Sequence, residues 1–259
     1  MILLCKIVNV LYYKFIKRGF IMERSVLKSN AKSQLKGKWW LTIAALLVSG
    51  MISSVTSGII STVSKGLGAA VSFCISGIVS FGVATYSLNV AKNRNAAFTD
   101  IFDGFNLNVI LKALVLGLIT TIATTAGFFL LIVPGIIIGI MFSQAFFIFV
   151  DNPELSPIDC IKESAEMMKG HKGEYFVLYL SFIGWALLIS IISIALIVAG
   201  VYIGELAAVI MIIAGVIAMI VMSLFLGAYV SITFANYYIG LKSMNDNNYS
   251  GDENNYSDF

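Results

Sequence analysis

The sequence predicts an all-α protein that crosses a membrane several times. Of its 259 residues, 59% are hydrophobic and only 12% are charged, whereas about 25% of the residues in an average soluble domain are charged. Apolar runs of roughly 20 residues, the length that a helix needs to cross a bilayer, recur along the chain. The charged residues cluster between these runs, so the solvent around the runs is expected to be lipid.

About six transmembrane helices are expected, at 41–63, 66–91, 109–133, 135–150, 175–199 and 206–241. Pro134 and Gly135 break the apolar run between the third and the fourth. The fourth would be only about 24 Å long as a helix, so it is either a short full crossing or a re-entrant leg. The sixth is longer than a bilayer requires, which predicts that it tilts or extends beyond the membrane.

These spans belong to a single integral-membrane domain at 22–242. Lysines and an arginine interrupt residues 1–21, which lack the uninterrupted core and cleavage site of a signal peptide. This stretch is either a basic surface helix or a leader ahead of a true start at Met22, and we favour the second interpretation. Residues 243–259 are polar and acidic and repeat the letters NNYS, so we predict a disordered tail.

Amphipathic surface helices are expected between the spans. In the first, apolar residues and lysines each recur every four positions, as Leu27, Ala31 and Leu35 and as Lys28, Lys32 and Lys36. Gly37 is placed to end this helix. Because Trp39 and Trp40 follow at once, the basic stripe favours contact with anionic headgroups over a merely solvated face.

Two further surface segments have the same character. In the segment 92–108, one helical face carries Phe98, Ile101, Phe102 and Phe105. The third segment starts at Ser156, which can cap a helix, and Gly170 is placed to end it. Its predicted apolar face consists of Ile158, Ile161, Ala165 and Met168.

The three segments suggest an internal repeat. The strings LKGKWW, FDGFNL and MKGHKGEYF each end a surface helix just before a span, and their glycines Gly37, Gly104 and Gly170 are evenly spaced. We hypothesise three units, each a surface helix followed by a membrane hairpin. The alternative is that any two crossings and a surface helix occupy about this length by geometry alone.

The basic residues predict the orientation. If the six segments alternate, Lys65 is the one residue among the 17 lysines and arginines that falls on the side opposite the amino terminus. Positive charge is enriched on the cytoplasmic side of bacterial membrane proteins. We therefore expect a multi-pass protein of the bacterial inner (plasma) membrane, with both termini in the cytoplasm.

Four stretches resemble a known family: RSVLKSNAKSQLKGKWW, FTDIFDGF, LIVPGIIIGIMFSQAFFIFVDNP and KESAEMMKGHKGEYFVLYLSFIGWALL. Together they resemble the bacterial integral-membrane family called domain of unknown function 975, over nearly all of the range from Met22 to Leu241. The resemblance implies a helical membrane protein. It implies no activity, because the family has none established.

The sequence lacks the patterns of common enzyme sites. His171 is the single histidine, which excludes the HExxH metalloprotease motif and leaves a Ser-His-Asp triad unsupported. Neither a GxxxxGK[ST] loop nor a GxGxxG fingerprint occurs. Lysines interleave with the acidic residues near Asp151, so these are expected to be ordinary helix charges and not metal ligands. We expect no catalytic residue, no cofactor and no metal.

The function expected is non-enzymatic: envelope or lipid homeostasis, or a scaffold for a partner through the cytoplasmic surface helices. The alternative is a small-solute or peptide transporter or exporter component, although the spans carry no ionisable group at mid-membrane. Expected partners are the bilayer with its anionic headgroups and either a protein partner or a second copy, but not nucleic acid. Candidate headgroup or partner contacts are Lys28, Lys32, Lys36, Lys38, Trp39, Trp40, Lys169, His171 and Lys172. Candidate structural residues are Gly37, Gly104, Pro134, Gly135, Gly170 and Trp185.

Overall fold

The computed structural model describes residues 23–63, 65–203 and 205–253, and its regular structure in these ranges is helical throughout. The elements are α2 (Arg24–Gln34), α3 (Trp39–Val63), α4 (Lys65–Ala91), η1 (Phe98–Phe105), α5 (Ile110–Leu130), α6 (Ile132–Met141), α7 (Ala145–Asp151), α8 (Pro157–Met167), α9 (Lys172–Ile203) and α10 (Glu205–Glu253). The predicted all-α class is confirmed. The leader predicted at 1–21 lies outside the described residues.

Several of these helices are long and apolar enough to cross a membrane. Among the described residues there are four: Ile110–Leu130, Ile132–Asp151, Lys172–Gly200 and Ala208–Asp246. Helix α2 and the start of α3 together would form a fifth span, although the two are bent by 97° relative to each other. The predicted membrane class therefore holds, whereas the described residues do not confirm about six spans.

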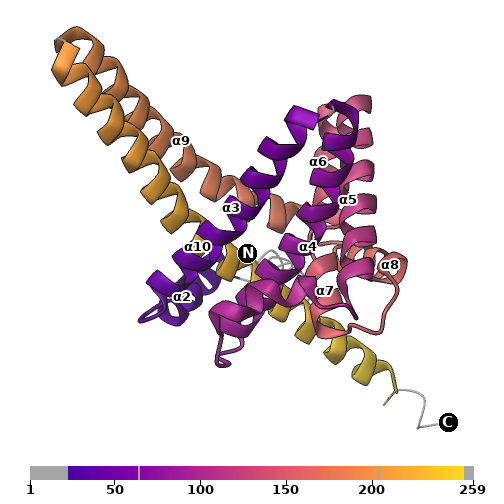
Figure 1. Cartoon of the computed structure of the whole chain (residues 1–259). Helices are drawn as coiled ribbons and strands as arrows, with labels where there is room; N and C mark the ends of the chain where they lie inside the picture. The colour runs from indigo at the N-terminus through magenta and orange to yellow at the C-terminus, as the bar shows by residue number, and fades with distance from the viewer. Residues whose placement is uncertain (1–22, 64, 204, 254–259) are drawn as a thin grey trace, which may run out of the picture.

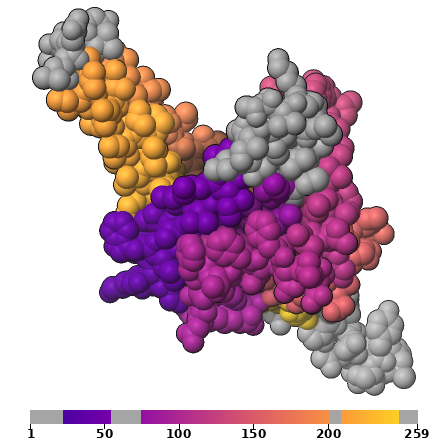
Figure 2. Space-filling model, viewed as in Figure 1, coloured from indigo at the N-terminus to yellow at the C-terminus, as the bar shows by residue number. Residues whose placement is uncertain are grey.

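The long helices form hairpins, and a short helix precedes each hairpin (Figure 1). The order is α2 before α3–α4, η1 before α5–α6, and α8 before α9–α10. The α9–α10 hairpin projects away from the rest as a separate arm (Figure 2). In the apolar stretches of α9 and α10, only 11% and 6% of the residues are buried. A hairpin that is apolar all round requires lipid as its solvent.

Glycines allow the hairpins to pack closely. A Cβ atom on Gly77 of α4 would lie 2.5 Å from the carbonyl oxygen of Ala113 and 3.0 Å from the Cα atom of Gly117, both on α5. Small residues at such contacts let the backbones of membrane helices approach each other. The contact between α4 and α5 joins the first two hairpins into one body.

The break between α5 and α6 differs from the prediction. It lies at Leu131, whose backbone is extended (φ −167°, ψ 158°), and not at Pro134. Pro134 instead lies in the first turn of α6, where a proline costs no backbone hydrogen bond. Gly135 packs against the ring of Phe128, with no room for a side chain.

The predicted fourth span is also interrupted. Residues 142–144 separate α6 from α7, so the segment 135–150 consists of the rest of one short helix and most of another. The two helices together, Ile132–Asp151, have the length and hydropathy of a span. The alternatives of a full crossing and a re-entrant leg therefore both stay predictions.

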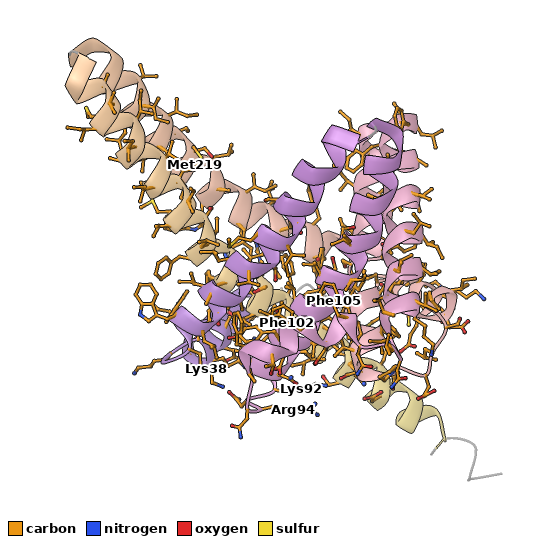
Figure 3. The ribbon with its side chains drawn as sticks, in the orientation of Figure 1. Lys38, Lys92, Arg94, Phe102, Phe105 and Met219 are labelled. Carbon is orange, nitrogen blue, oxygen red and sulfur yellow. The ribbon has the colours of Figure 1, made fainter. Side chains whose placement is uncertain are left out.

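The second surface segment packs along α4. Ile101 of η1 is buried, whereas Phe102 and Phe105 are 41% and 40% exposed and point outward (Figure 3). A Cβ atom on Gly104 would collide with the backbone carbonyl of Ile78. Gly104 therefore serves a close contact, unlike Gly37 and Gly170, which have φ angles of +84° and +83° after helix ends.

The third surface helix, α8, begins as predicted but buries a different face. The hydroxyl of Ser156 accepts a hydrogen bond from the backbone N–H of Asp159, and Pro157 is in the first turn. The buried residues are Cys160, Ser164, Met167 and Met168, while Ile158 is 55% exposed. The predicted face is wrong by part of a turn because α8 packs on the break between α6 and α7.

The last helix, α10, has 49 residues and is about 74 Å long at 1.5 Å per residue. It extends beyond the arm and passes along α2, α3, α4 and α8. This length is more than a bilayer requires, and tilting and extension beyond the membrane both stay predictions. It continues past Ser243 to Glu253, into the segment for which the sequence predicts disorder.

Candidate functional site

The end of the molecule opposite the hairpin tips is held together by a polar cluster around Asp151. Its side chain is only 8% exposed and lies at the end of α7. One carboxylate oxygen accepts from Lys92, which follows α4, and the other accepts from Lys242 at 2.8 Å and Tyr238 at 3.0 Å, both on α10. Two cations and a hydroxyl thus neutralise and solvate one buried carboxylate.

A second polar contact joins α2 to α10. The side-chain amide of Asn236 donates to Gln34 at 2.6 Å, and the amide of Gln34 donates back to Asn236 at 3.1 Å. Gln34 also donates to the backbone carbonyl of Ala91 at the end of α4. This amide pair provides a hydrogen-bond donor to the last carbonyl of α4 and fixes α2 against α10.

Ser164 supplies side-chain hydrogen bonds to two backbone groups at the break between α6 and α7. Its hydroxyl donates to the carbonyl of Met141 at 2.7 Å and accepts from the N–H of Gln144 at 3.2 Å. Both of these groups would otherwise be unpaired in a buried place. Gln144 is fully buried, and its Oε1 atom has no hydrogen-bond partner among the described residues.

The candidate contacts on α2 and at the start of α3 divide into outward and inward groups. Lys32 and Lys36 are exposed, Trp40 is 79% exposed, and Lys38 lies with Lys92 and Arg94 at the same end of the molecule (Figure 3). Lys28 is different, because it turns inward and is partly buried. Its ammonium donates to the Ser181 hydroxyl at 2.8 Å and lies 4.5 Å from the centre of the Phe182 ring.

The candidate contacts after α8 lie close together at the start of α9. Lys169 is exposed and forms a loose pair with Glu166 at 3.7 Å. His171 is 3.3 Å from Glu174, and its backbone carbonyl accepts from the Tyr237 hydroxyl. Lys172, the first residue of α9, is partly exposed. The hydrogen bond from Tyr237 ties the turn between α8 and α9 to α10.

Two apolar grooves follow the seam of the α9–α10 arm. The first, which we call the aromatic groove, has a volume of about 590 Å³. It is lined among others by Trp39 of α3, Trp185 and Leu188 of α9, and Met222, Phe225 and Tyr229 of α10. The candidate structural residue Trp185 is 60% exposed in this groove.

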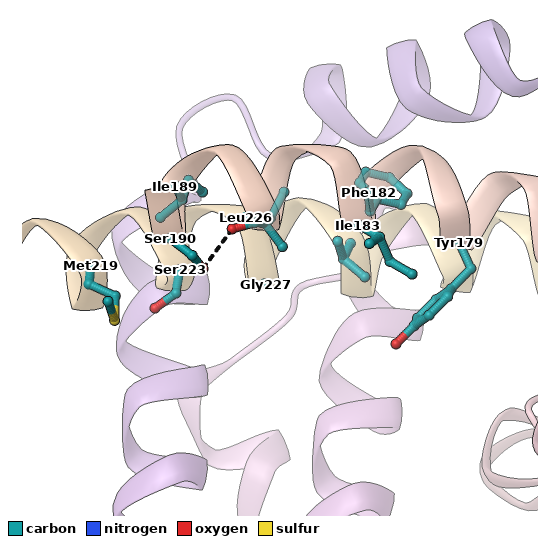
Figure 4. Close-up of a pocket in the computed structure, with 11 residues that line it drawn as sticks. Tyr179, Phe182, Ile183, Ile189, Ser190, Met219, Ser223, Leu226 and Gly227 are labelled. Atoms are coloured by element: carbon teal, nitrogen blue, oxygen red, sulfur yellow. Dashed lines mark hydrogen bonds between the residues drawn. The ribbon is translucent and has the colours of Figure 1, made fainter. Parts of the chain in front are cut away.

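The second groove, on another face of the same arm, has a volume of about 470 Å³ (Figure 4). Two serines line it, but their hydroxyls donate within their own helices: Ser190 to the carbonyl of Ala186 and Ser223 to that of Ile220. The groove therefore offers apolar surface and little hydrogen bonding to a ligand.

Sequence reasoning missed most of the polar contacts. No sequence pattern predicted the hydrogen-bond partners of Gln34, Ser164, Asn236 and Tyr238. A single polar residue in a helix is compatible with many partners. The sequence predicts Asp151 to be an ordinary helix charge, whereas the structure buries its side chain between Lys92 and Lys242. Within the part of the chain that the structure describes, no three His, Cys, Asp or Glu side chains are placed to hold a metal ion.

Comparison with known proteins gives one match. The family model described as "Protein of unknown function (DUF975)" matches residues 120–245, from the middle of α5 into α10. The resemblance predicted from the sequence is confirmed over this range, which is shorter than Met22 to Leu241. No curated protein and no solved structure matches the chain.

Proposed function

Because residues 120–245 match a family of unknown function, we propose a role from the geometry: a non-enzymatic protein of the bacterial plasma membrane that gathers anionic phospholipids at its cytoplasmic face, in envelope homeostasis. The observation that carries the proposal is the outward basic row on α2. Lys32 and Lys36 are exposed on it, one turn apart, just before Trp39 and Trp40.

The packing of α2 supports this role. Leu27, Ala31 and Leu35 are buried against the rest of the protein, with 6%, 0% and 0% of their surface exposed. The apolar stripe is therefore used inside the protein, and the lysines on the other face are free to meet the membrane surface. Each lysine near an anionic surface contributes about 1 kcal/mol of attraction.

The proposed orientation in the membrane follows from the position of the basic side chains at one end of the molecule. Lys38, Lys92 and Arg94 lie at one end of the molecule (Figure 3), Lys92 binds Asp151 there, and Lys65 is at the other end of α4. With the basic end in the cytoplasm, the hairpins cross the bilayer and both termini are cytoplasmic, as the positive-inside rule favours.

Lipid extraction tests the proposal. Membrane patches that hold the full-length protein would be extracted with a styrene–maleic acid polymer, and their lipids would be quantified. The double variant Lys32→Glu/Lys36→Glu should lower the share of anionic lipid, while Lys162→Glu on α8, whose side chain is 72% exposed, serves as the control for a charge reversal outside α2. Equal lipid composition in all three proteins would overturn the proposal.

A deletion strain provides the physiological arm of the test. Loss of the protein should change sensitivity to cationic antimicrobial peptides, which bind anionic lipid. Wild type should restore the phenotype and the double variant should not, at equal protein levels. Restoration by the double variant would count against a role of this surface.

One observation favours a second candidate, a small-solute or peptide exporter component. Gln144 is buried with an unpaired Oε1 atom at the break between two helices, and broken helices line the substrate sites of many transporters. This function predicts flux of radiolabelled amino acids or dipeptides from reconstituted vesicles, which Gln144→Ala abolishes. Vesicles with and without the protein that leak equally would exclude it for these solutes.

A further inference from the structure

We propose that the aromatic groove and Lys28 form a subsite for one anionic phospholipid, with the lipid phosphate at the Lys28 ammonium and an acyl chain in the groove. The proposal deepens the proposed function and rests on it for the orientation in the membrane. It names a single bound molecule, whereas the outward row of Lys32 and Lys36 attracts lipid without a defined site.

The first element of the subsite is a cation without a counter-ion. Lys28 is partly buried, and its ammonium has a serine hydroxyl and an aromatic ring as neighbours. Arg24 lies one helical turn before it and adds a second positive charge. No ion pair involves Lys28 within the described ranges of the chain. A partly desolvated cation of this kind favours an anionic ligand.

The second element is the direction of the groove. Ser181, Trp185 and Leu188 are spaced by four and three residues, so they lie on one face of α9. Ser181 binds the Lys28 ammonium, and the other two line the groove. The groove therefore begins about one turn beyond the cation, some 6 Å along the helix, and continues into the apolar arm.

The third element is a set of contacts that holds the cation at the mouth of the groove. The hydroxyl of Tyr229, which lines the groove, donates to the backbone carbonyl of Lys28 at 3.3 Å. Its ring packs edge-on against Phe182, the ring below the ammonium, with 5.5 Å between the centroids. The cation and the apolar wall are thus one connected structure.

Charge and shape together favour a phospholipid over a second copy of the chain. A volume of about 590 Å³ is within the usual range of ligand pockets. A helix from another copy would fill the groove but would also have to place an acidic side chain beside Lys28 to match its charge. A phospholipid carries its phosphate charge next to its acyl chains. It can therefore bind the Lys28 ammonium and fill the apolar groove at the same time.

The tryptophans provide a direct measurement. The chain has three tryptophans; Trp39 and Trp185 line the groove, and Trp40 contacts Phe225 in its wall. Full-length protein would be reconstituted in nanodiscs of phosphatidylcholine. Phosphatidylglycerol with brominated acyl chains would be titrated in, with brominated phosphatidylcholine as the neutral reference, because bromine quenches tryptophan only on contact.

The anionic lipid should quench saturably at low mole fraction, well above the neutral lipid. Lys28→Gln should weaken this preference at least about tenfold, because a charge-assisted hydrogen bond contributes more than 1.4 kcal/mol. Lys28→Arg should retain it. Lys162→Gln on α8, whose side chain is 72% exposed and lies outside the α2 lysine row, is the control and should behave as wild type.

A count of bound lipids by native mass spectrometry keeps the test decisive if Lys28→Gln is less stable. Wild type and Lys162→Gln should keep one phosphatidylglycerol after delipidation, and Lys28→Gln should lose it. Equal quenching by both lipids in the wild-type protein, or an unchanged preference in folded Lys28→Gln, overturns the subsite. If extraction still shows enrichment that depends on Lys32 and Lys36, the proposed function survives while the subsite fails.

Discussion

The carboxylate of Asp151 at the end of α7 lies 2.8 Å from the ammonium of Lys242 on α10, which is 91 residues later in the chain. Lys92, which is 59 residues earlier, binds the other oxygen of the same carboxylate. One acidic side chain thus links the end of α7 to the residue that follows α4 and to α10. Loss of this carboxylate is therefore expected to destabilise the protein.

Asp151→Ala should destabilise the protein by roughly 3 kcal/mol, because it leaves two lysine charges and the Tyr238 hydroxyl without their acceptor. The free energy of unfolding would be measured by titration with sodium dodecyl sulfate in mixed micelles. Asp159→Ala is the control, since that carboxylate is 54% exposed and 3.8 Å from Lys162, so its loss should cost under about 1 kcal/mol. Equal losses for the two variants would contradict the structural role of the cluster.

Ser164→Ala should cost about 1–3 kcal/mol, because it leaves the carbonyl of Met141 and the N–H of Gln144 buried and unpaired. The same unfolding titration measures the loss. Ser33→Ala removes an exposed hydroxyl that binds only the carbonyl of Asn30, and should change stability by less than about 0.5 kcal/mol. A neutral Ser164→Ala would mean that the break between α6 and α7 is satisfied in another way.

Cys160 should be nearly inert toward thiol reagents. Its side chain is fully buried, and burial, with the negative charges of Glu163 and Asp159, raises its pKa to about 11. At pH 8 the thiol is protonated, so maleimide should react about a hundredfold more slowly than with a free cysteine. The reaction would be followed in a Cys5→Ser/Cys74→Ser background, and unfolding in detergent should restore the normal rate.

Lys162→Cys in the same background is the positive control, because the Lys162 side chain is 72% exposed two residues further on α8. An impermeant reagent should label it only after cells are opened if this face is cytoplasmic. Labelling of Lys162→Cys in intact cells would show that this face is extracytoplasmic and would contradict the proposed orientation. Fast labelling of native Cys160 would contradict the buried face of α8.

Gly77→Ala should destabilise the contact between α4 and α5 by about 1–3 kcal/mol, because the added methyl group would collide with the backbone at Ala113 and Gly117. Gly184→Ala on α9 is the matched control. A Cβ atom there meets nothing within 4 Å, so this variant should be neutral or more stable by up to about 1 kcal/mol. Similar effects of the two changes would show that the close approach of α4 and α5 is not needed.

Local features of the fold were predictable from short stretches of sequence. The apolar stripe of α2, the Ser156 cap of α8 and the long apolar helices each depend on residues within a few turns of one another. Helix periodicity and capping are local physics, so an alternation of residue types is enough to predict them. The family resemblance followed from similar local strings.

The candidate site was less predictable, because its contacts join distant residues. Gln34 and Asn236 are 202 positions apart, and Lys28 and Ser181 are 153 apart. The lysine stripe of α2 was recognised as basic, but its periodicity could not distinguish Lys28, which faces the arm, from Lys32, which faces outward. That distinction depends on how α2 packs against α10.

The sequence by itself determined that this chain is helical and apolar over bilayer lengths, with basic residues between the spans, because composition and periodicity act within each segment. Only the tertiary structure decided which face of α8 is buried, where the helical path is interrupted between α5 and α6, and which lysine of α2 turns inward against Ser181 and Phe182. Those outcomes depend on the close approach of helices at glycines and on pairing polar groups across hairpins. Both are properties of the packed molecule and of no single stretch of the chain.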